Sequence, residues 1–118
     1  MKGINNKNAL ITAGATGIGK ATAVALMSAG ARVHVCDIDA HALDTLKQQY
    51  PQLSTSVTNV AQPDEVAQMF HQLDQDFAGK LDFLVNNAGI SGPAGPMESL
   101  DIEAWKATFD VNLHATFY

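Results

Sequence analysis

Residues 12–19, Thr-Ala-Gly-Ala-Thr-Gly-Ile-Gly, constrain the fold of this chain more than any other stretch. The apolar run 9–11 leads into them and predicts a strand, and the alanine-rich run 20–29 follows them and predicts a helix. Glycine turns the chain between the two without strain and leaves room for a ligand beside the backbone. The first N–H groups of the following helix lack intrahelical partners and attract anions. We therefore expect a phosphate-binding loop here.

The glycine spacing is compatible with two kinds of nucleotide-binding loop. Gly14-x-x-x-x-Gly19-Lys20 nearly matches a Walker A loop, but Ala21 stands where that loop needs a Ser or Thr hydroxyl for Mg²⁺. Gly14-x-x-Gly17-x-Gly19 is instead a variant of the dinucleotide fingerprint with altered spacing. A glycine cluster alone does not distinguish these two classes, so residues further along the chain must decide between them.

Composition fits one small globular domain, residues 1–118. Of these residues 47 % are hydrophobic and only 16 % are charged, which argues against disorder. A net charge of −5 gives no basic face for nucleic acid or an anionic membrane. The single cysteine, Cys36, excludes an internal disulfide and fits a reducing compartment. With no signal peptide and no membrane-spanning apolar run recognised, we expect a cytoplasmic protein.

Predicted strands alternate regularly with predicted helices along the chain. The strands are expected at 8–13, 31–37, 53–58 and 81–86, and the helices at 17–29, 39–50, 63–78 and from 101 onward. This order predicts an α/β fold, the doubly wound parallel sheet of a Rossmann fold, of which about four strands are present. The fourth strand is an apolar run too dense to alternate and is expected to be buried on both faces. In the last helix, an inward apolar face is expected at Ile102, Trp105, Phe109 and Leu113.

Asp37 ends the second predicted strand, near the position at which an acid meets the adenosine ribose of a dinucleotide. Its carboxylate can accept hydrogen bonds from ribose hydroxyls and would repel a 2′-phosphate. Thr16 and Ile38 supply no cation for such a phosphate. These features favour NAD over NADP, and the alternative interpretation is that Asp37 serves as a turn or helix-cap acid.

Asn86-Asn87-Ala88-Gly89 follows the fourth predicted strand, where a P-loop nucleoside triphosphatase would carry an acid. The Walker interpretation therefore lacks both its hydroxyl and its acid. Amides at this position can tie neighbouring strands together and bond a ribose, and the small residues Ala88 and Gly89 leave space for a flat ring. The four patches at the strand ends, 14–19, Asp37, Asn59 and 86–89, would converge on one crevice.

These motifs, with Val111-Asn112-Leu113, resemble the N-terminal half of a short-chain dehydrogenase/reductase, and the resemblance covers essentially the whole chain. It implies an oxidoreductase that transfers a hydride between NAD(H) and a small alcohol or ketone. By this resemblance the pyrophosphate would be cradled by Gly14, Gly17, Ile18 and Gly19. The adenosine would be held by Asp37, Ile38, Asn59 and Val60, and the nicotinamide-side ribose by Asn87, Ala88 and Gly89. Asn112 would be the catalytic asparagine, which helps hold a water in a proton relay to a lysine.

The chain departs from the family pattern at three places. Ala13 replaces the usual first glycine, which is tolerable if the backbone there is extended. Asn59 replaces the usual aspartate beside the adenine, and its amide oxygen can still accept a hydrogen bond. The family's catalytic serine and Tyr-x-x-x-Lys are expected beyond a fifth strand and are not found among residues 1–118. Tyr118 does not supply this tyrosine, because no lysine follows it. We therefore expect that these residues belong to a longer protein, that they are inactive alone, and that the fourth strand has an open edge.

Two further expectations complete the prediction. The four histidines, His34, His41, His71 and His114, lack metal-ligand spacing, so no metal site is expected. The helix that carries Trp105 often packs between subunits in the family, which implies a homo-oligomer, a dimer or a tetramer. The alternative function is a non-catalytic NAD(H)-binding fragment or degenerate paralogue. A P-loop nucleoside triphosphatase is a distant third.

Overall fold

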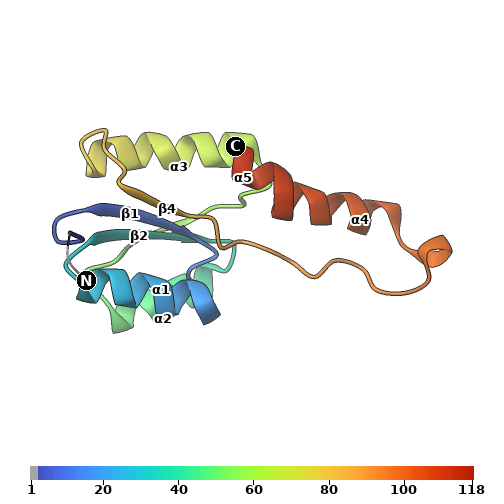
Figure 1. Ribbon diagram of the computed structural model, residues 1–118, viewed down its shortest axis with the longest axis horizontal. Coiled ribbons are helices and arrows are strands. Elements are labelled where there is room, and N and C mark those ends of the chain that lie inside the picture. The colour runs from blue at the N-terminus through green and yellow to red at the C-terminus, as the bar shows by residue number, and fades with distance from the viewer. Residues whose placement is uncertain (1–2) are drawn as a thin grey trace.

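The computed structural model describes residues 3–118, which form one parallel sheet with helices on both faces (Figure 1). The strands are β1 (Asn8–Thr12), β2 (Arg32–Asp37), β3 (Ser54–Val57) and β4 (Phe83–Val85). Their order across the sheet is β3-β2-β1-β4, and every neighbouring pair is parallel. The predicted α/β doubly wound sheet is confirmed, and no strand end differs from its predicted position by more than two residues.

Helices α1 (Gly17–Ser28) and α2 (Ala40–Gln49) cover one face of the sheet, and α3 (Pro63–Asp76) covers the other (Figure 1). The predicted cap of α2 is confirmed, because the Asp39 carboxylate accepts from the Ala42 N–H at 2.9 Å. Helix α3 begins at Pro63, where a missing N–H costs nothing. Gly30, with φ of 93°, turns the chain from α1 into β2.

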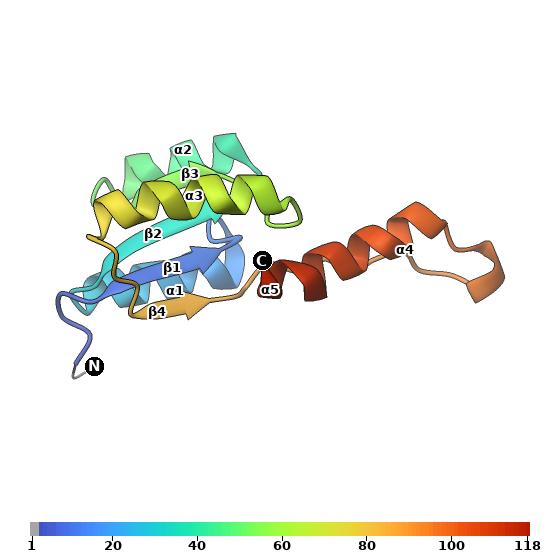
Figure 2. The same cartoon turned by 90° about the horizontal axis from the view of Figure 1, so that it is seen from above.

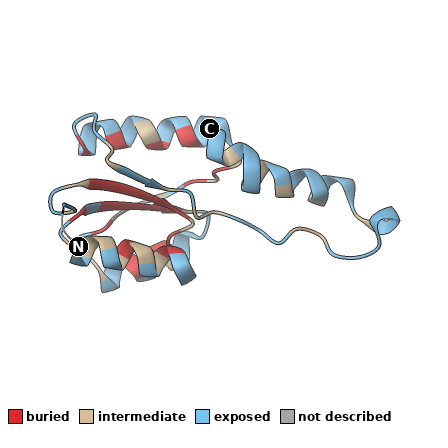
Figure 3. Cartoon of the chain, viewed as in Figure 1, coloured by how far each residue is buried: buried red, intermediate tan, exposed pale blue. Residues whose placement is uncertain are grey.

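Two apolar clusters fill the two spaces between sheet and helices, and β1 and β2 are buried along most of their length (Figure 3). Because side chains alternate along a strand, β1 sends Ala9 and Ile11 to the α1–α2 side and Leu10 to the α3 side. The first cluster also contains Ala23, Val33, Val35, Leu43, Leu46 and Leu53. The second contains Cys36, Val60, Met69, Leu73 and Phe77.

The prediction that the fourth strand is buried on both faces is wrong. Strand β4 pairs only with β1, and Phe83 and Leu84 keep 37 % and 47 % of their surface exposed. It lies at the edge of the sheet, since no further strand among residues 3–118 pairs with its outer side. The apolar run that suggested two-sided burial is present, and the expectation of an open edge agrees with this arrangement.

The predicted inward face of the last helix is also wrong. Helix α4 (Ile102–Phe109) begins as expected, with Asp101 accepting from the Ala104 N–H at 2.7 Å. However, Ile102, Trp105, Phe109 and Leu113 are all exposed. The helix extends away from the sheet in both views, so no other helix or strand of residues 3–118 covers it (Figures 1 and 2). Within residues 3–118, no helix is both long and apolar enough to cross a bilayer.

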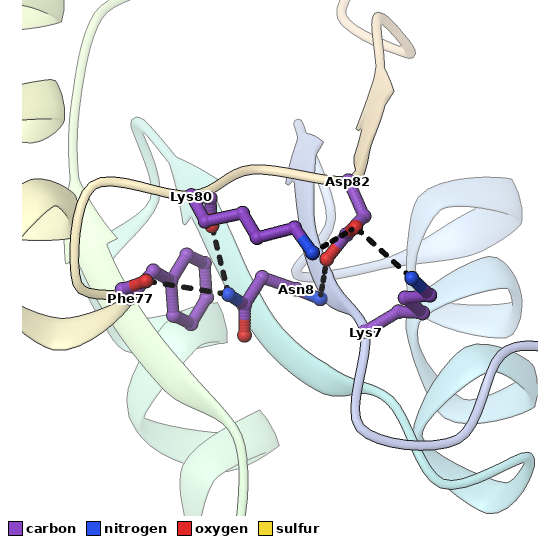
Figure 4. A network of polar contacts seen from close by, with 5 residues as sticks. All are labelled: Lys7, Asn8, Phe77, Lys80 and Asp82. Carbon is purple, nitrogen blue, oxygen red and sulfur yellow. Dashed lines mark hydrogen bonds and ion pairs between the residues drawn. The ribbon is translucent and has the colours of Figure 1, made fainter.

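A polar cluster fastens β4 to β1 at the end of the sheet opposite the predicted site (Figure 4). The Asp82 carboxylate accepts from the Asn8 N–H at 2.9 Å and lies 3.4 Å from the amines of both Lys7 and Lys80. The Asn8 N–H bond, followed by the two lysines, holds the pKa of Asp82 below its usual range. The Asn8 side chain donates to the carbonyls of Lys80 and Phe77, which fixes the connection from α3 into β4.

Candidate functional site

A cavity of about 260 Å³ opens at the carboxyl ends of the strands. Its lining includes six residues predicted from the sequence as cofactor ligands: Asp37, Ile38, Asn59, Val60, Ala88 and Gly89. It also includes residues that no motif assigned as ligands: Ala13, Thr16, Thr58, Ile90 and Val111. The remaining predicted residues, Gly14, Gly17, Ile18, Gly19, Asn87 and Asn112, do not line the cavity, although several of them shape the backbone around it.

Ala13 has a φ of 50°, so the condition under which alanine would be tolerable here, an extended backbone, is not met. An L-residue with a side chain is strained in this left-handed region. The conformation is fixed from both sides of the loop. The Ala13 carbonyl accepts from the Asn87 side chain at 2.9 Å, and the Gly14 N–H reaches the Cys36 carbonyl at 3.2 Å.

Gly17 and Gly19 serve the loop in different ways. Gly17 has a φ of 54° and open space where a side chain would stand, so it meets a conformational need at the start of α1. At Gly19 a Cβ would lie 2.5 Å from the Ala13 carbonyl oxygen and 2.6 Å from the Asn87 side-chain nitrogen. Gly19 therefore lets α1 approach β1 and the loop after β4 closely.

The N-terminus of α1 carries no side-chain cap. Thr16 precedes the helix without a capping hydrogen bond, and the first turn holds no acidic residue. At the start of α2 and of α4, by contrast, an aspartate side chain accepts a hydrogen bond from a backbone N–H of the first turn. Free first-turn N–H groups beside an open glycine, at the mouth of a cavity, fit the phosphates of a dinucleotide.

Asp37 lies at the end of β2 and lines the cavity, as its position predicted. One carboxylate oxygen accepts from the Ala15 N–H of the glycine loop at 3.1 Å, and the other accepts from the Asp39 N–H at 3.1 Å. The carboxylate thus makes a turn contact and also lines the cavity, and the ribose interpretation stays a prediction. Among residues 3–118, no lysine, arginine or histidine lines this cavity.

Asn59 lies on the other side of the cavity, after β3. Its side-chain oxygen accepts from the Ala61 N–H at 3.0 Å, and its own N–H donates to Glu65 at 2.7 Å. These bonds form the turn that leads into α3. A contact from this amide oxygen to a base would use its second lone pair.

Thr12 joins β1 to the loop after β4, a role that the motif did not reveal. Its hydroxyl oxygen accepts from the N–H groups of both Asn87 and Ala88 at 3.0 Å. The Asn87 side chain donates in return to the carbonyls of Thr12 and Ala13. The sequence does contain a signal for this role: Thr12 is a hydroxyl residue at the carboxyl end of a predicted strand, where polar side chains can contact the loops of neighbouring strands.

Asn112 lies outside the cavity, and its side chain makes two hydrogen bonds to the backbone of one residue. Its oxygen accepts from the Ile90 N–H and its nitrogen donates to the Ile90 carbonyl, each at 2.8 Å. It stands within a π-helical turn, Asp110–His114, that joins α4 to the short α5 (Ala115–Phe117). Such turns are frequent at functional sites, and here the turn directs Asn112 towards the residue that follows Gly89.

A larger polar groove, of about 700 Å³, lies between β3 and α3 and reaches Thr58, which also lines the first cavity. It contains the buried His34, whose two ring nitrogens lie 2.7 Å from the Ser54 hydroxyl and 2.8 Å from the Ser56 hydroxyl. Burial lowers the pKa of His34 to about 4, and nearby Asp76 opposes the shift. Burial likewise raises the pKa of the Cys36 thiol to about 11, so this cysteine is an inert core residue, as predicted.

Metal ligands do not gather anywhere in the part of the chain that the structure describes. Among residues 3–118, no three His, Cys, Asp or Glu side chains come together as a metal site would require. His34 is engaged by serines, as described above, and His114 pairs with Asp110 at 2.9 Å.

Comparison with known proteins identifies the family. A family model described as short chain dehydrogenase matches residues 7–118. The chain belongs to the short-chain dehydrogenase family. The resemblance drawn from the glycine loop, Asp37, the Asn86–Gly89 turn and Asn112 is therefore confirmed.

Individual relatives of this short-chain dehydrogenase sequence are named dehydrogenases. A cyclohexanol dehydrogenase of Acinetobacter sp. is 38 % identical over 118 residues, which is 97 % of this chain and 47 % of the relative. A galactitol 2-dehydrogenase of Agrobacterium fabrum is 38 % identical over 119 residues, with 98 % and 44 % covered. Both names describe enzymes that oxidise alcohols. The chain spans about half the length of these relatives.

Solved structures agree with the fold. A crystal structure of a short chain dehydrogenase from Bacillus anthracis superposes with a TM-score of 0.88 at 30 % sequence identity. The match covers 98 % of this chain and 48 % of that protein. The parallel sheet and its helices are thus those of a short-chain dehydrogenase.

Proposed function

We propose that this chain binds NAD(H) in the cavity at the strand ends and supplies the cofactor half of a dehydrogenase that interconverts an alcohol and a ketone. The observation that carries the proposal is the carboxylate of Asp37 in a cavity whose lining, within the part of the chain that the structure describes, contains no basic side chain. A carboxylate suits the free ribose hydroxyls of NAD and repels the 2′-phosphate of NADP.

The residues around the cavity fit such a cofactor. The uncapped start of α1, with Gly17 beside it, would hold the pyrophosphate, and Asp37 with Ile38 would hold the adenosine ribose. Asn59 and Val60 would flank the adenine, and Ala88 and Gly89 would border the nicotinamide ribose. When bound, NAD(H) would supply the hydride acceptor or donor of the reaction.

The roles of Asn87 and Asn112 in this proposal are to position backbone. Asn87 holds the loop after β4 against the glycine loop, and Asn112 holds Ile90, which borders the cavity. The two bonds to Ile90 use one lone pair of the Asn112 oxygen and one hydrogen of its NH₂ group, so the second lone pair and the second hydrogen can still bond a water of a proton relay. Tyr-x-x-x-Lys is not present among residues 1–118.

Replacing Asp37 with Ala tests the proposal. In the natural polypeptide that carries this sequence, we expect the variant to weaken NAD(H) binding far more than NADP(H) binding. Equal losses for the two cofactors would refute the ribose role. The alternative, a non-catalytic NAD(H)-binding protein, predicts the same binding result but no alcohol-dependent reduction of NAD by the natural polypeptide.

We also propose that the protein is a homo-oligomer. Helix α4 and the turn after it expose a row of large apolar side chains, among them Trp105 and Phe109, whose rings lie 5.4 Å apart. Exposed apolar surface of this kind is typical of protein interfaces. Mass measurement in solution at working concentration tests this, and a monomer with NAD-linked activity would contradict it.

A further inference from the structure

The carboxylate of Asp37 does more than face the cavity, because it also holds the glycine loop in place. Its two oxygens accept from two backbone N–H groups, those of Ala15 and Asp39, each at 3.1 Å. Ala15 lies in the middle of the loop and is 3 % exposed. Asp39 begins the turn into α2. One side chain therefore connects the loop after β1 to the turn after β2.

We propose that Asp37 is a positioning residue that shapes the phosphate-binding loop before any cofactor arrives. The inference rests on the proposed cofactor function and extends it. An ionised carboxylate has about four lone-pair sites, and the two backbone bonds use two of them. The other two are left for the vicinal hydroxyls of a ribose. Recognition of the ribose and the shape of the phosphate loop would then depend on the same carboxylate.

The rest of the loop shows why such an anchor is needed. On the side facing β4, the Asn87 amide holds the Ala13 carbonyl at 2.9 Å, and Ala13 is strained at a φ of 50°. On the side facing β2, the loop is held by the Gly14 N–H on the Cys36 carbonyl and by the Ala15 N–H on Asp37. Without the carboxylate, the buried Ala15 N–H would lose its partner, which is unfavourable.

Electrostatics alone predict the opposite effect on anion binding, and this makes the proposal testable. Removing a negative charge near the phosphate loop should strengthen the binding of any anion there. If Asp37 also shapes the loop, its removal should instead weaken the binding of an anion that never touches the ribose subsite. The sign of the change separates the two roles.

The experiment uses inorganic pyrophosphate as the probe and the natural polypeptide that carries this sequence. Asp37→Ala is compared with Asp39→Ala, which removes an equal charge two residues away but leaves the Asp39 N–H in place. We expect Asp37→Ala to weaken pyrophosphate binding by about tenfold. Asp39→Ala should leave it unchanged or slightly stronger. Stronger or unchanged binding in Asp37→Ala would overturn the proposal.

Hydrogen exchange of the Ala15 amide, measured without cofactor, provides a second readout. We expect this amide to exchange about tenfold faster in Asp37→Ala, while amides in the middle of β1 keep the wild-type rate. If Asp37→Ala does not fold, Asp37→Leu replaces it. Leucine has a similar shape and offers no acceptor to the Ala15 N–H. Wild-type exchange at Ala15 in the folded variant would overturn the proposal.

The two proposals fail in different ways. If the wild-type protein binds no NAD(H) but Ala15 exchange still depends on Asp37, the cofactor function is refuted and the loop anchor stands. If Asp37→Ala weakens NAD(H) binding but leaves hydrogen exchange at Ala15 unchanged, Asp37 acts on the ribose alone and the anchor is refuted.

Discussion

The side chain of Asn112 pairs with the backbone of Ile90 in both directions, with each hydrogen bond 2.8 Å long. Ile90 lies at the border of the strand-end cavity, whereas Asn112 lies in the π-helical turn after α4. Through this pair the projecting helix is connected to the loop that follows β4. The amide is suited to the task because only a side chain with both a donor and an acceptor can satisfy both backbone groups.

Replacing Asn112 with Ala should therefore release Ile90. We expect faster hydrogen exchange at the Ile90 amide and a loss of about 1–2 kcal/mol in the free energy of unfolding, because two backbone groups lose their partners. Asn112→Asp should be no better, since it sets a carboxylate oxygen against the Ile90 carbonyl. If Ile90 exchanges at the wild-type rate in both variants, the positioning role of Asn112 is wrong.

Thr12 should be sensitive to the loss of its hydroxyl rather than of its methyl group. Thr12→Val leaves the N–H groups of Asn87 and Ala88 without their acceptor, and we expect it to cost about 1–3 kcal/mol in chemical denaturation. Thr12→Ser keeps the hydroxyl and should cost less than about 1 kcal/mol. Equal losses in the two variants would mean that packing, not the hydrogen bonds, dominates at this position.

Ala13→Gly should stabilise the protein. The left-handed backbone strains an alanine by about 1–2 kcal/mol, and glycine relieves this at an entropic cost of about 0.5–1 kcal/mol. We expect a net gain of about 0.5–1 kcal/mol, measured by urea denaturation. The matched control is Ala21→Gly in the exposed part of α1, which should lose about 1 kcal/mol. A loss at both positions would contradict the strain assigned to Ala13.

Stability should fall as the pH drops from about 6.5 towards 4. The folded-state pKa of His34, about 4, lies below its ordinary value of 6.5, so the unfolded chain binds a proton that the folded chain does not. The stabilisation is complete above pH 6.5, and a loss on the order of 2 kcal/mol is expected between pH 7 and pH 4.5. His34→Gln should flatten this dependence. Asp82 affects stability over a different pH range: because its folded-state pKa is lowered, its contribution is lost only as the pH falls below its ordinary pKa of 3.8.

The sequence predicts the layers and the site region because both follow from local patterns. The alternation of strands and helices, the glycine loop and Asp37 at a strand end determine where the cavity must lie. The exposure of β4 and α4 could not be predicted in the same way. The apolar runs that contain Leu84 and Trp105 indicate that an apolar surface covers them, but not whether residues 3–118 supply that surface. The left-handed Ala13 and the Ala15–Asp37 bond were also hidden, since both arise from contacts between segments far apart in the chain.

The affinity for NADH against NADPH tests the central claim most directly. Fluorescence titration of the natural polypeptide that carries this sequence should give a dissociation constant at least about tenfold lower for NADH, because the carboxylate of Asp37 repels a 2′-phosphate and none of the described residues that line the cavity is basic. Equal affinities, or tighter binding of NADPH, would contradict the account.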